Sequence, residues 1–171
     1  MLASKVSILH DGQISEVGAP EALYHNPQKA ETMHYLGFPQ ANFINGRLHK
    51  TAVSCQVHTE LFDAAINVGL LENKKDALGK TAVVGLRPEH IHFGTPPRAR
   101  ALTCEATVYL REDLGGEELV YLEVSNNRLV AVLRNDQKEQ LVAALDEKTT
   151  IWIDPHDLFV FENGRQVGRG Q

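Results

Sequence analysis

The sequence predicts a mainly β protein, with a small barrel that follows a short segment of mixed strands and helices. Two observations lead to this prediction. From residue 42 onward, short runs of alternating apolar and polar residues recur between Gly, Asn and Pro turns, as is typical of small barrels. The first forty residues instead combine two short apolar runs with two stretches of helical character.

A β-hairpin is predicted at the start of the chain. Residues 6–9 are mostly apolar, and the pair Asp11-Gly12 is a strong turn signal before the second run, residues 14–17. Gly18 is expected to end this second strand.

Two short helices should follow the hairpin. Pro20 opens the first, as far as His25, because proline lacks only an N–H that is unpaired at a helix start. The Asn-Pro pair at 26–27 caps a second helix over residues 28–36, which Gly37 terminates. Hairpin and helices together are too small to bury a core, so we expect them to lie at the edge of something larger.

Strands dominate the remainder. The runs with strand character are 53–57, 81–86, 104–110, 119–124, 129–133, 151–153 and 158–161. Turn signals at 115–116, 126–127, 154–155 and 163–164 separate the later ones. Residues 136–145 are ambiguous, because Leu141, Val142 and Leu145 also fit one face of a helix.

Composition narrows the class of protein. Of the 171 residues, 43% are hydrophobic, which is enough for a core, and the net charge of -5 argues against a nucleic-acid partner. Two cysteines, Cys55 and Cys104, suggest reduced, buried thiols rather than a disulfide scaffold. No run approaches the roughly 18 apolar residues of a membrane span, and no signal-peptide pattern opens the chain. We therefore expect a soluble, intracellular protein whose membrane association, if any, comes through partners.

Sequence motifs for catalysis are missing. The sequence has no G-x-x-x-x-G-K-[ST] loop for phosphates, no G-x-S-x-G nucleophile turn and no Cys-x-x-Cys metal motif. We therefore expect no enzyme activity and no cofactor in this chain, and we assign no catalytic, cofactor-binding or metal-binding residue.

Histidines and acidic residues offer weaker candidates. His90 and His92 would share one face of a strand and could hold a metal, and His156 lies within an acidic loop, 154–157. Ordinary turn or surface histidines are the favoured interpretation for both. An acidic cluster that surrounds the Gly-Gly turn is interpreted as a solvated loop tip, with cation or partner binding as the alternative; its members are Glu112, Asp113, Glu117 and Glu118.

Several segments, in the right order, resemble a known family. Residues 2–6, 9–14, 17–21, 24–27 and 36–43 resemble the last part of the nucleotide-binding domain of ABC-importer ATPases and its link to the accessory domain. Val-Gly-Leu-Arg-Pro-Glu-His-Ile at 84–91 is similar to the signature of the transport-associated OB (TOBE) domain; residues 114–118 and 155–161 are similar to its turn and its closing strand. The resemblance is to importers of the maltose and glycerol-3-phosphate type. The chain departs from the family at Glu31, Thr32 and Phe38, in and after the linking helix.

The resemblance implies a domain organisation. Residues 1–40 would be the C-terminal remnant of the nucleotide-binding domain, and residues 41–171 an OB-fold-like (TOBE/MOP-like) regulatory domain. The family keeps its phosphate loop, signature motif, magnesium-binding acid and switch histidine before this region. The chain is therefore expected to be a fragment without the ATP site, with ATP and Mg²⁺ bound by the parent subunit.

The resemblance also implies partners and a location. The expected partners are a second copy in a C2 homodimer, membrane permease subunits reached through the parent ATPase domain, and regulatory proteins. The transporter would hold the protein on the cytoplasmic face of the inner or plasma membrane, and the solute would be a sugar, a polyol or a glycerol phosphate.

Seven residues are the candidate interface or structural motif: Arg87, Pro88, Glu89, His90, Gly115, Gly116 and Glu117. For the first four, a corner between two strands of the barrel is favoured, with a dimer contact or signalling to the ATPase as alternatives. A different function also stays open, that of a small-molecule or oxyanion-binding OB module. The Thr149-Thr150 and Asn126-Asn127 pairs are the residues available for that role.

Overall fold

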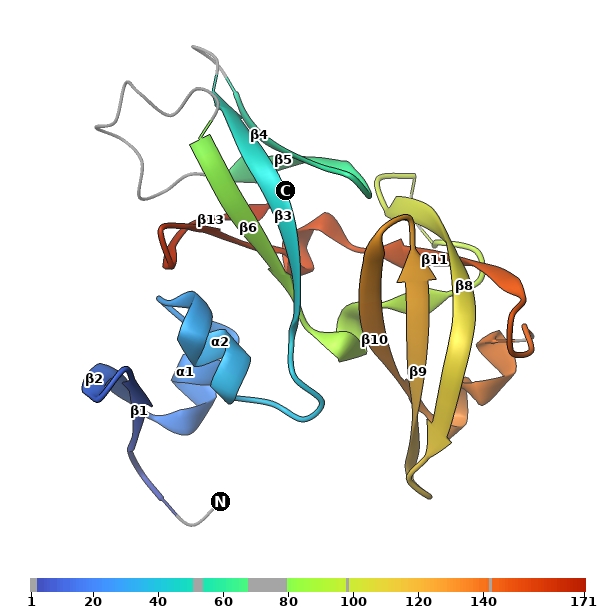
Figure 1. Cartoon of the computed structure of the whole chain (residues 1–171), viewed down its shortest axis with the longest axis horizontal. Helices are drawn as coiled ribbons and strands as arrows, with labels where there is room; N and C mark the ends of the chain where they lie inside the picture. Colours follow the sequence, from blue (N-terminus) through green and yellow to red (C-terminus); the bar gives the residue numbers. More distant parts are fainter. Residues whose placement is uncertain (1–2, 51–53, 68–79, 98, 142) are drawn as a thin grey trace.

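The computed structural model describes residues 3–50, 54–67, 80–97, 99–141 and 143–171. It consists of a small N-terminal segment, a closed barrel and an open sheet (Figure 1). None of the helices in these residues has the length and hydropathy that crossing a membrane requires.

The N-terminal segment has the elements that were predicted. Strands β1 (Val6–His10) and β2 (Gln13–Gly18) form an antiparallel hairpin whose turn has positive φ at both Asp11 and Gly12. Helix α1 (Pro20–His25) begins at its proline. Helix α2 (Ala30–Tyr35) starts two residues later than predicted, because residues 28 and 29 pair with a distant strand instead: Gln28 O accepts from the Gln166 amide, and Lys29 bridges to Arg165.

A closed barrel follows, with strands in the order β12-β13-β5-β4-β3-β6. Its members are β3 (Asn42–Lys50), β4 (Cys55–Thr59), β5 (Asp63–Asn67), β6 (Lys80–Leu86), β12 (Phe159–Glu162) and β13 (Arg165–Gly170). The strand predicted at 53–57 is therefore β4, although Val53 lies outside the described residues. The β12–β13 turn has positive φ at Asn163 and Gly164, as the Asn-Gly signal indicates.

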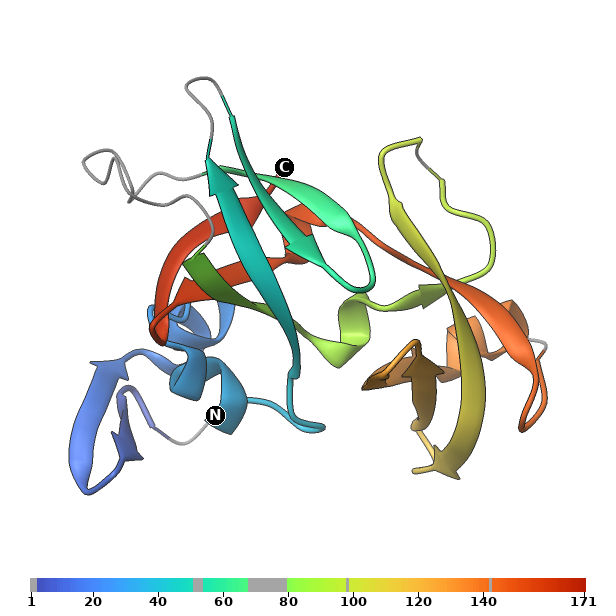
Figure 2. The same ribbon diagram turned by 45° about the horizontal axis from the view of Figure 1, so that its top comes forward.

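The other strands form a separate sheet beside the barrel, with the order β10-β9-β8-β11-β7 (Figure 2). They are β7 (His92–Phe93), β8 (Leu102–Asp113), β9 (Glu117–Val124), β10 (Asn127–Arg134) and β11 (Lys148–Ile153). The prediction of an OB-like, mainly β fold is confirmed, but the strands are divided between a barrel and an open sheet. This division could not be predicted from the sequence, because the strands of both units have the same two-residue period.

Two short 3₁₀ turns join the barrel to the sheet. Turn η1 (Pro88–His90) leads from β6 to β7, and η3 (Pro155–Asp157) returns from β11 to β12. Each begins with a proline, whose fixed φ suits the first position of a turn. The residues around 88 and 155 are thus crossovers between two units rather than corners within one barrel.

The ambiguous segment contains no α-helix in its described part. Residues Asn135–Gln140 form a 3₁₀ turn, η2, after which Leu141 is buried and Leu145 is largely exposed. Val142 lies outside the described residues. The helical spacing of these leucines therefore did not correspond to one buried face.

One apolar core runs through both β units, from Ile44 and Val84 in the barrel to Val108 and Ile151 in the sheet. A smaller cluster joins α2 to the barrel; it consists of Met33, Ala41, Phe159 and Phe161. Gly85 leaves the space for this contact, because a Cβ there would lie 2.5 Å from Met33 Sδ. Both cysteines are free: Cys55 is buried as expected, whereas Cys104 is only half-buried.

Candidate functional site

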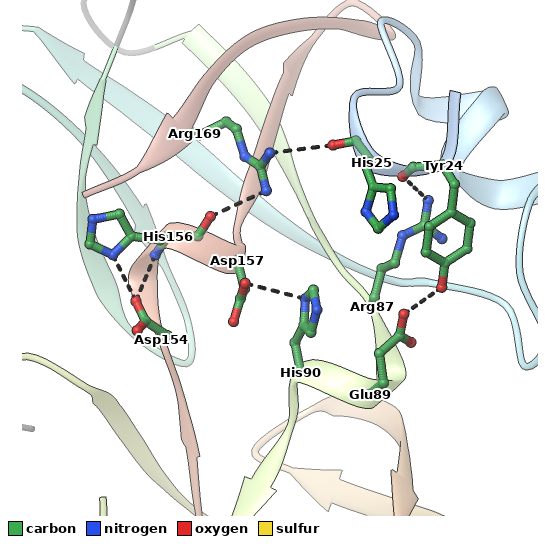
Figure 3. Close-up of polar contacts among 9 residues, drawn as sticks. All are labelled: Tyr24, His25, Arg87, Glu89, His90, Asp154, His156, Asp157 and Arg169. Atoms are coloured by element: carbon green, nitrogen blue, oxygen red, sulfur yellow. Dashed lines mark hydrogen bonds and ion pairs between the residues drawn. The ribbon is translucent and has the colours of Figure 1, made fainter. Parts of the chain in front are cut away.

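The predicted Arg-Pro-Glu-His motif lies where the barrel, the open sheet and the N-terminal helices meet. Arg87 follows β6 directly, and its side chain is 2% exposed. Its Nη1 donates to the carbonyl oxygen of Leu36 at 2.7 Å, and its Nη2 donates to that of Tyr24 at 2.6 Å (Figure 3 includes the Tyr24 contact). One guanidinium therefore binds the C-terminal ends of both α1 and α2. We call this set, with Glu89, the Arg87 junction.

The chemistry of helix ends explains why arginine suits this position. The last carbonyl oxygens of a helix have no partner within the helix, and they carry the negative end of its dipole. A planar guanidinium can donate in two directions at once while its face contacts an aromatic ring. Arg87 does both, since its Cζ lies 3.5 Å from the centroid of the Tyr24 ring.

Glu89 holds the aromatic ring of the junction in place. The Tyr24 hydroxyl donates a hydrogen bond to the Glu89 carboxylate (Figure 3). Burial and this bond to a carboxylate raise the pKa of Tyr24 to about 12, although the nearby Arg87 charge acts in the opposite direction. Tyr24 is therefore a neutral hydrogen-bond donor at any physiological pH.

Gly37 gives the junction its space. It has φ of +132°, and a Cβ added there would lie 3.1 Å from Arg87 Nη1. Glycine was predicted at this place to end the helix, and in the structure it also admits the guanidinium.

A second arginine, Arg169, binds the C-terminal end of α1. It was not identified from the sequence. Arg169, in β13, donates to the carbonyl oxygens of His25 and His156, each at 3.3 Å (Figure 3). Its Cζ lies 4.0 Å from the centroid of the Phe159 ring. Two consecutive carbonyls of α1 are thus bound by two arginines of the barrel. No sequence motif marked Arg169, which stands beyond the segments that resemble the family.

The histidines of this region form contacts with acids and rings. His90 Nδ1 lies 3.6 Å from Asp157 Oδ1, which brings η1 and η3 together (Figure 3). His92 instead stacks on Trp152, with ring centroids 4.2 Å apart, and burial lowers its pKa. Among the described residues, no three His, Cys, Asp or Glu side chains are grouped to hold a metal ion. The metal hypothesis for His90 and His92 has no support here.

Asp154 and His156 form the pair that the sequence suggested as a polar loop. Asp154 Oδ1 accepts from the backbone N–H of His156 at 3.0 Å, and His156 Nδ1 lies 2.8 Å from the same oxygen. The carboxylate therefore caps η3 and orients the imidazole.

The Gly-Gly motif lies elsewhere, in the β8–β9 turn at the end of the open sheet (Figure 1). Gly115 has φ of +87°, and its N–H donates to Asp113 Oδ1 at 2.7 Å. Glu117 O accepts from the Leu114 amide at 2.9 Å, which closes the turn. The interpretation as a solvated acidic tip needs one correction: Glu118 is buried and forms a two-pronged ion pair with Arg111.

Comparisons with known proteins agree with this geometry. Residues 84–161, which include η1 and η3, match the family model of the TOBE domain. The maltose/maltodextrin import ATP-binding protein MalK of Photorhabdus laumondii is 28% identical over 169 residues, or 98% of this chain and 44% of that protein. MalK of Shigella flexneri is 31% identical over 154 residues, 89% of this chain and 39% of that protein.

An ATP-binding subunit whose name states another cargo and one solved structure also match. The sulfoquinovosyl glycerol transport ATP-binding protein SmoE of Agrobacterium fabrum is 28% identical over 162 residues, 94% of this chain and 42% of that protein. The chain thus spans less than half the length of these curated relatives. Among solved structures, the cytoplasmic molybdate-binding protein ModG matches with a TM-score of 0.55 and 16% identity, over 70% of this chain and 94% of that one, which indicates a shared fold. Residues 84–161 therefore match the TOBE domain family, and the chain is similar over nearly its whole length to the C-terminal part of sugar-importer ATP-binding subunits.

Proposed function

We propose that this chain is the accessory, regulatory and dimerising part of the ATP-binding subunit of a solute importer. The observation that carries the proposal is the match of almost the whole chain to MalK and SmoE, together with the TOBE domain at residues 84–161. The cargo would be a sugar or a glycerol phosphate, as the names of these relatives and the sequence resemblance suggest.

Residues 1–40 would be the end of the ATP-binding domain, and residues 41–171 the accessory domain. Exposed large apolar side chains favour this division because several of them gather on the first forty residues: Leu9, Ile14, Val17, Tyr35 and Phe38. Apolar surface of this kind is expected to be covered by another part of a protein. ATP and Mg²⁺ would bind to that other part, so that this chain by itself hydrolyses no ATP.

The Arg87 junction would make the accessory domain and the end of the ATP-binding domain move as one body. Displacing α1 or α2 from the barrel would break charge-assisted hydrogen bonds and leave buried groups unpaired. Regulators that bind the barrel could then act on the ATP-binding part without contacting it. In this view, Arg87, Pro88, Glu89 and His90 serve signalling to the ATPase through a structural contact.

The barrel side of the molecule would pair with a second copy. Two ATP-binding parts joined in this way can separate and meet again without dissociation, because their effective concentration stays high. The ATP-binding part would contact the permease subunits, and the assembly would lie on the cytoplasmic side of the membrane.

A hybrid subunit tests this function. The matching region of Shigella flexneri MalK is replaced by this chain, and the hybrid is assembled with the MalK permease partners in liposomes. We expect maltose-stimulated ATP hydrolysis by the hybrid, and clearly less by the same hybrid with Arg87→Met. The ATP-binding part of MalK without any C-terminal region is the baseline, and a hybrid that does no better than this baseline would contradict the proposal.

Dimerisation is measured separately by sedimentation equilibrium of the hybrid, with the truncated ATP-binding part as control. We expect association of the hybrid without nucleotide, and monomers only for the control. Monomeric hybrid at all concentrations would remove the dimerising role and leave the regulatory one.

The oxyanion-binding alternative is favoured by one observation. Thr149 and Thr150 line a surface pocket together with Glu147 and with Lys148, whose Nζ donates to Glu105 Oε1 at 2.6 Å. The ModG match supports the fold needed but not the ligand. A thermal-shift titration with molybdate and sulfate decides between the two: a concentration-dependent rise in Tm that Lys148→Met abolishes would favour this alternative.

A further inference from the structure

The surface pocket beside β11 borders an open edge of the sheet. Strand β11 lies between β8 and β7, but β7 pairs with only two of its residues, Ile151 and Trp152. In the part of the chain that the structure describes, Lys148, Thr149 and Thr150 therefore have a paired strand only on the β8 side. On the other side lies the pocket, with a volume of about 570 Å³, which is in the usual range for binding sites.

Backbone hydrogen bonds show which groups of β11 face this pocket. The Val108 N–H of β8 donates to Glu147 O at 3.0 Å, and from there every second residue of β11 directs its backbone groups towards β8. Lys148 and Thr150 lie between those residues and direct theirs to the opposite side. There the Gly94 N–H donates to Thr150 O at 3.3 Å. Among the described residues, neither the Thr150 N–H nor the N–H and C=O of Lys148 has a strand partner.

The chain's own strand β7 cannot cover this edge. If β7 continued in its observed register, Pro96 would lie opposite Lys148, and proline has no N–H to donate to the Lys148 carbonyl. Gly94 has φ of +81°, which turns the chain out of line with β7 before that point. Both Gly94 and Pro96 line the pocket. The place that a longer β7 would occupy is therefore a pocket.

The groups that face the pocket match a peptide backbone better than an anion. The N–H and C=O of Lys148 are one donor and one acceptor on the same residue, which is the pair that a residue of an antiparallel strand binds. An anion in the same place would meet the Lys148 carbonyl and the Glu147 carboxylate, which also lines the pocket. The Lys148 ammonium donates to Glu105 Oε1 at 2.6 Å, so that its charge is already matched.

We propose that an extended peptide segment of a partner protein binds in this pocket as an added strand, antiparallel to β11 and in line with β7. One residue of the segment would exchange both backbone hydrogen bonds with Lys148, a mode of recognition that uses the open edge of a sheet. Ala143 and Pro96 line the pocket and favour small side chains on the segment. This site is separate from the Arg87 junction and does not depend on the importer function.

A displayed library of random hexapeptides is the probe for this site. Peptides are selected on the wild-type chain, and those that also bind Lys148→Pro are removed. Proline at position 148 removes an N–H that takes no part in the pairing with β8. By calorimetry, we expect selected peptides to bind Lys148→Pro at least about tenfold more weakly than wild type, because a backbone bond is lost and the ring fills its place. Lys148→Gln keeps the backbone and should bind within about twofold of wild type.

The peptide backbone is tested in the same way. N-methylation of the amide that binds Lys148 O should weaken a selected peptide at least about tenfold, whereas N-methylation of the next amide, which faces away from β11, should not. Peptides that bind Lys148→Pro as well as wild type, a selection that yields none, or equal effects of the two methylations would overturn the proposal.

Unfolding of the variants tests the open edge itself. Lys148→Pro should keep a Tm close to that of wild type, whereas Thr149→Pro, which removes an N–H directed towards β8, should lower Tm by roughly 5 °C or more. Equal losses for both variants would mean that the edge is not open, and would overturn the proposal. Dimerisation of the chain that Lys148→Pro abolishes, measured by sedimentation equilibrium, would make a second copy the occupant and overturn the assignment to a separate partner.

Discussion

At the scale of single residues, Arg87 is the side chain that binds the ends of both N-terminal helices at once. A buried guanidinium is tolerated only when its charge and its N–H groups are matched. Arg87 satisfies this requirement with Leu36 O, Tyr24 O and the face of the Tyr24 ring. The arginine in turn supplies hydrogen-bond donors to two carbonyl oxygens at helix ends, where no partner exists within the helix.

Replacing Arg87 should therefore be costly for stability. We expect Arg87→Met to lower the free energy of unfolding by about 3 kcal/mol, and Arg87→Lys to fall between Met and wild type, because lysine keeps the charge but cannot donate in two fixed directions. Urea unfolding measures both. Arg128→Met, at an exposed arginine, is the control and should change stability by less than about 1 kcal/mol. Equal losses at positions 87 and 128 would refute the role of the junction.

The raised pKa of Tyr24 predicts that the free energy of unfolding falls at alkaline pH. Because its pKa is raised to about 12 in the folded protein and the ordinary value is 10.0, the folded state prefers the neutral phenol. The contribution of the neutral Tyr24 phenol to the free energy of unfolding is complete below pH 10, and it is lost as the pH rises from there through about 12. We expect the difference in unfolding free energy between wild type and Tyr24→Phe to be constant at neutral pH and to shrink across this range.

Absorbance of the phenolate provides an independent measurement. Of the four tyrosines, the one that titrates last in the folded protein should be missing in Tyr24→Phe. An unchanged late-titrating component in this variant would contradict the assignment.

The Arg-Pro-Glu-His motif could be singled out from the sequence, but its partners could not. Arg87 was expected to belong to a corner between two strands of the barrel, whereas it binds carbonyls 51 and 63 residues earlier in the chain. A backbone carbonyl belongs to every residue, so no pattern marks the two that Arg87 meets. Arg169 was missed for the same reason, since the two groups to which it donates, His25 O and His156 O, are also carbonyls.

At the scale of elements, the two 3₁₀ turns determine how barrel and sheet are joined. Turn η3 packs against the end of β13 so closely that Gly170 has no space for a side chain, because the nearest atoms are backbone atoms of Pro155. A flexible side chain could move aside, but a proline carbonyl in a tight turn cannot do so cheaply.

Glycine substitutions should reveal this contact. We expect Gly170→Ala to lower the unfolding free energy by at least about 2 kcal/mol, because the η3 backbone must shift. Gly116→Ala is the matched control: a Cβ there would meet no atom within 4 Å, so its effect should stay within about 0.5 kcal/mol. Thermal and urea unfolding measure both variants. A tolerated Gly170→Ala would mean that η3 lies farther from β13 than the structure has it.

Individual elements followed the sequence well where a local signal existed. Asp11-Gly12 and Asn163-Gly164 have the positive φ values that their turns require, and Pro20 begins α1. The start of α2 and the segment 136–145 were less predictable, because long-range partners decided them. Gln28 pairs with β13 instead of continuing a helix, and Leu141 is buried although no α-helix forms there.

At the scale of the whole molecule, the barrel and the open sheet share one apolar core, and the Asn42 side chain adds a polar contact between them at the edge of the sheet. Strand β10 is the edge strand of the open sheet. The Asn42 side chain substitutes for a neighbouring strand at its middle: Oδ1 accepts from the Val130 N–H at 2.7 Å, and Nδ2 donates to Val130 O at 2.9 Å. Because Asn42 belongs to β3 of the barrel, it joins the two units directly. The sequence could not predict this pairing, which spans 88 residues and uses an ordinary asparagine.

Asn42→Ala should weaken the contact between the barrel and the open sheet without disturbing the apolar core that they share. Asn42 is only 6% exposed, so its loss leaves the backbone N–H and C=O of Val130 without their partners, and we expect stability to fall by about 2 kcal/mol. Hydrogen exchange at the Val130 amide should become at least about tenfold faster, while amides at the centre of β9 change less. Asn127→Ala, at the more exposed end of the same strand, is the control and should behave as wild type within about 0.5 kcal/mol. If Val130 exchanges no faster in Asn42→Ala than in Asn127→Ala, the Asn42 side chain does not protect the middle of β10 and contributes nothing to the contact between barrel and sheet.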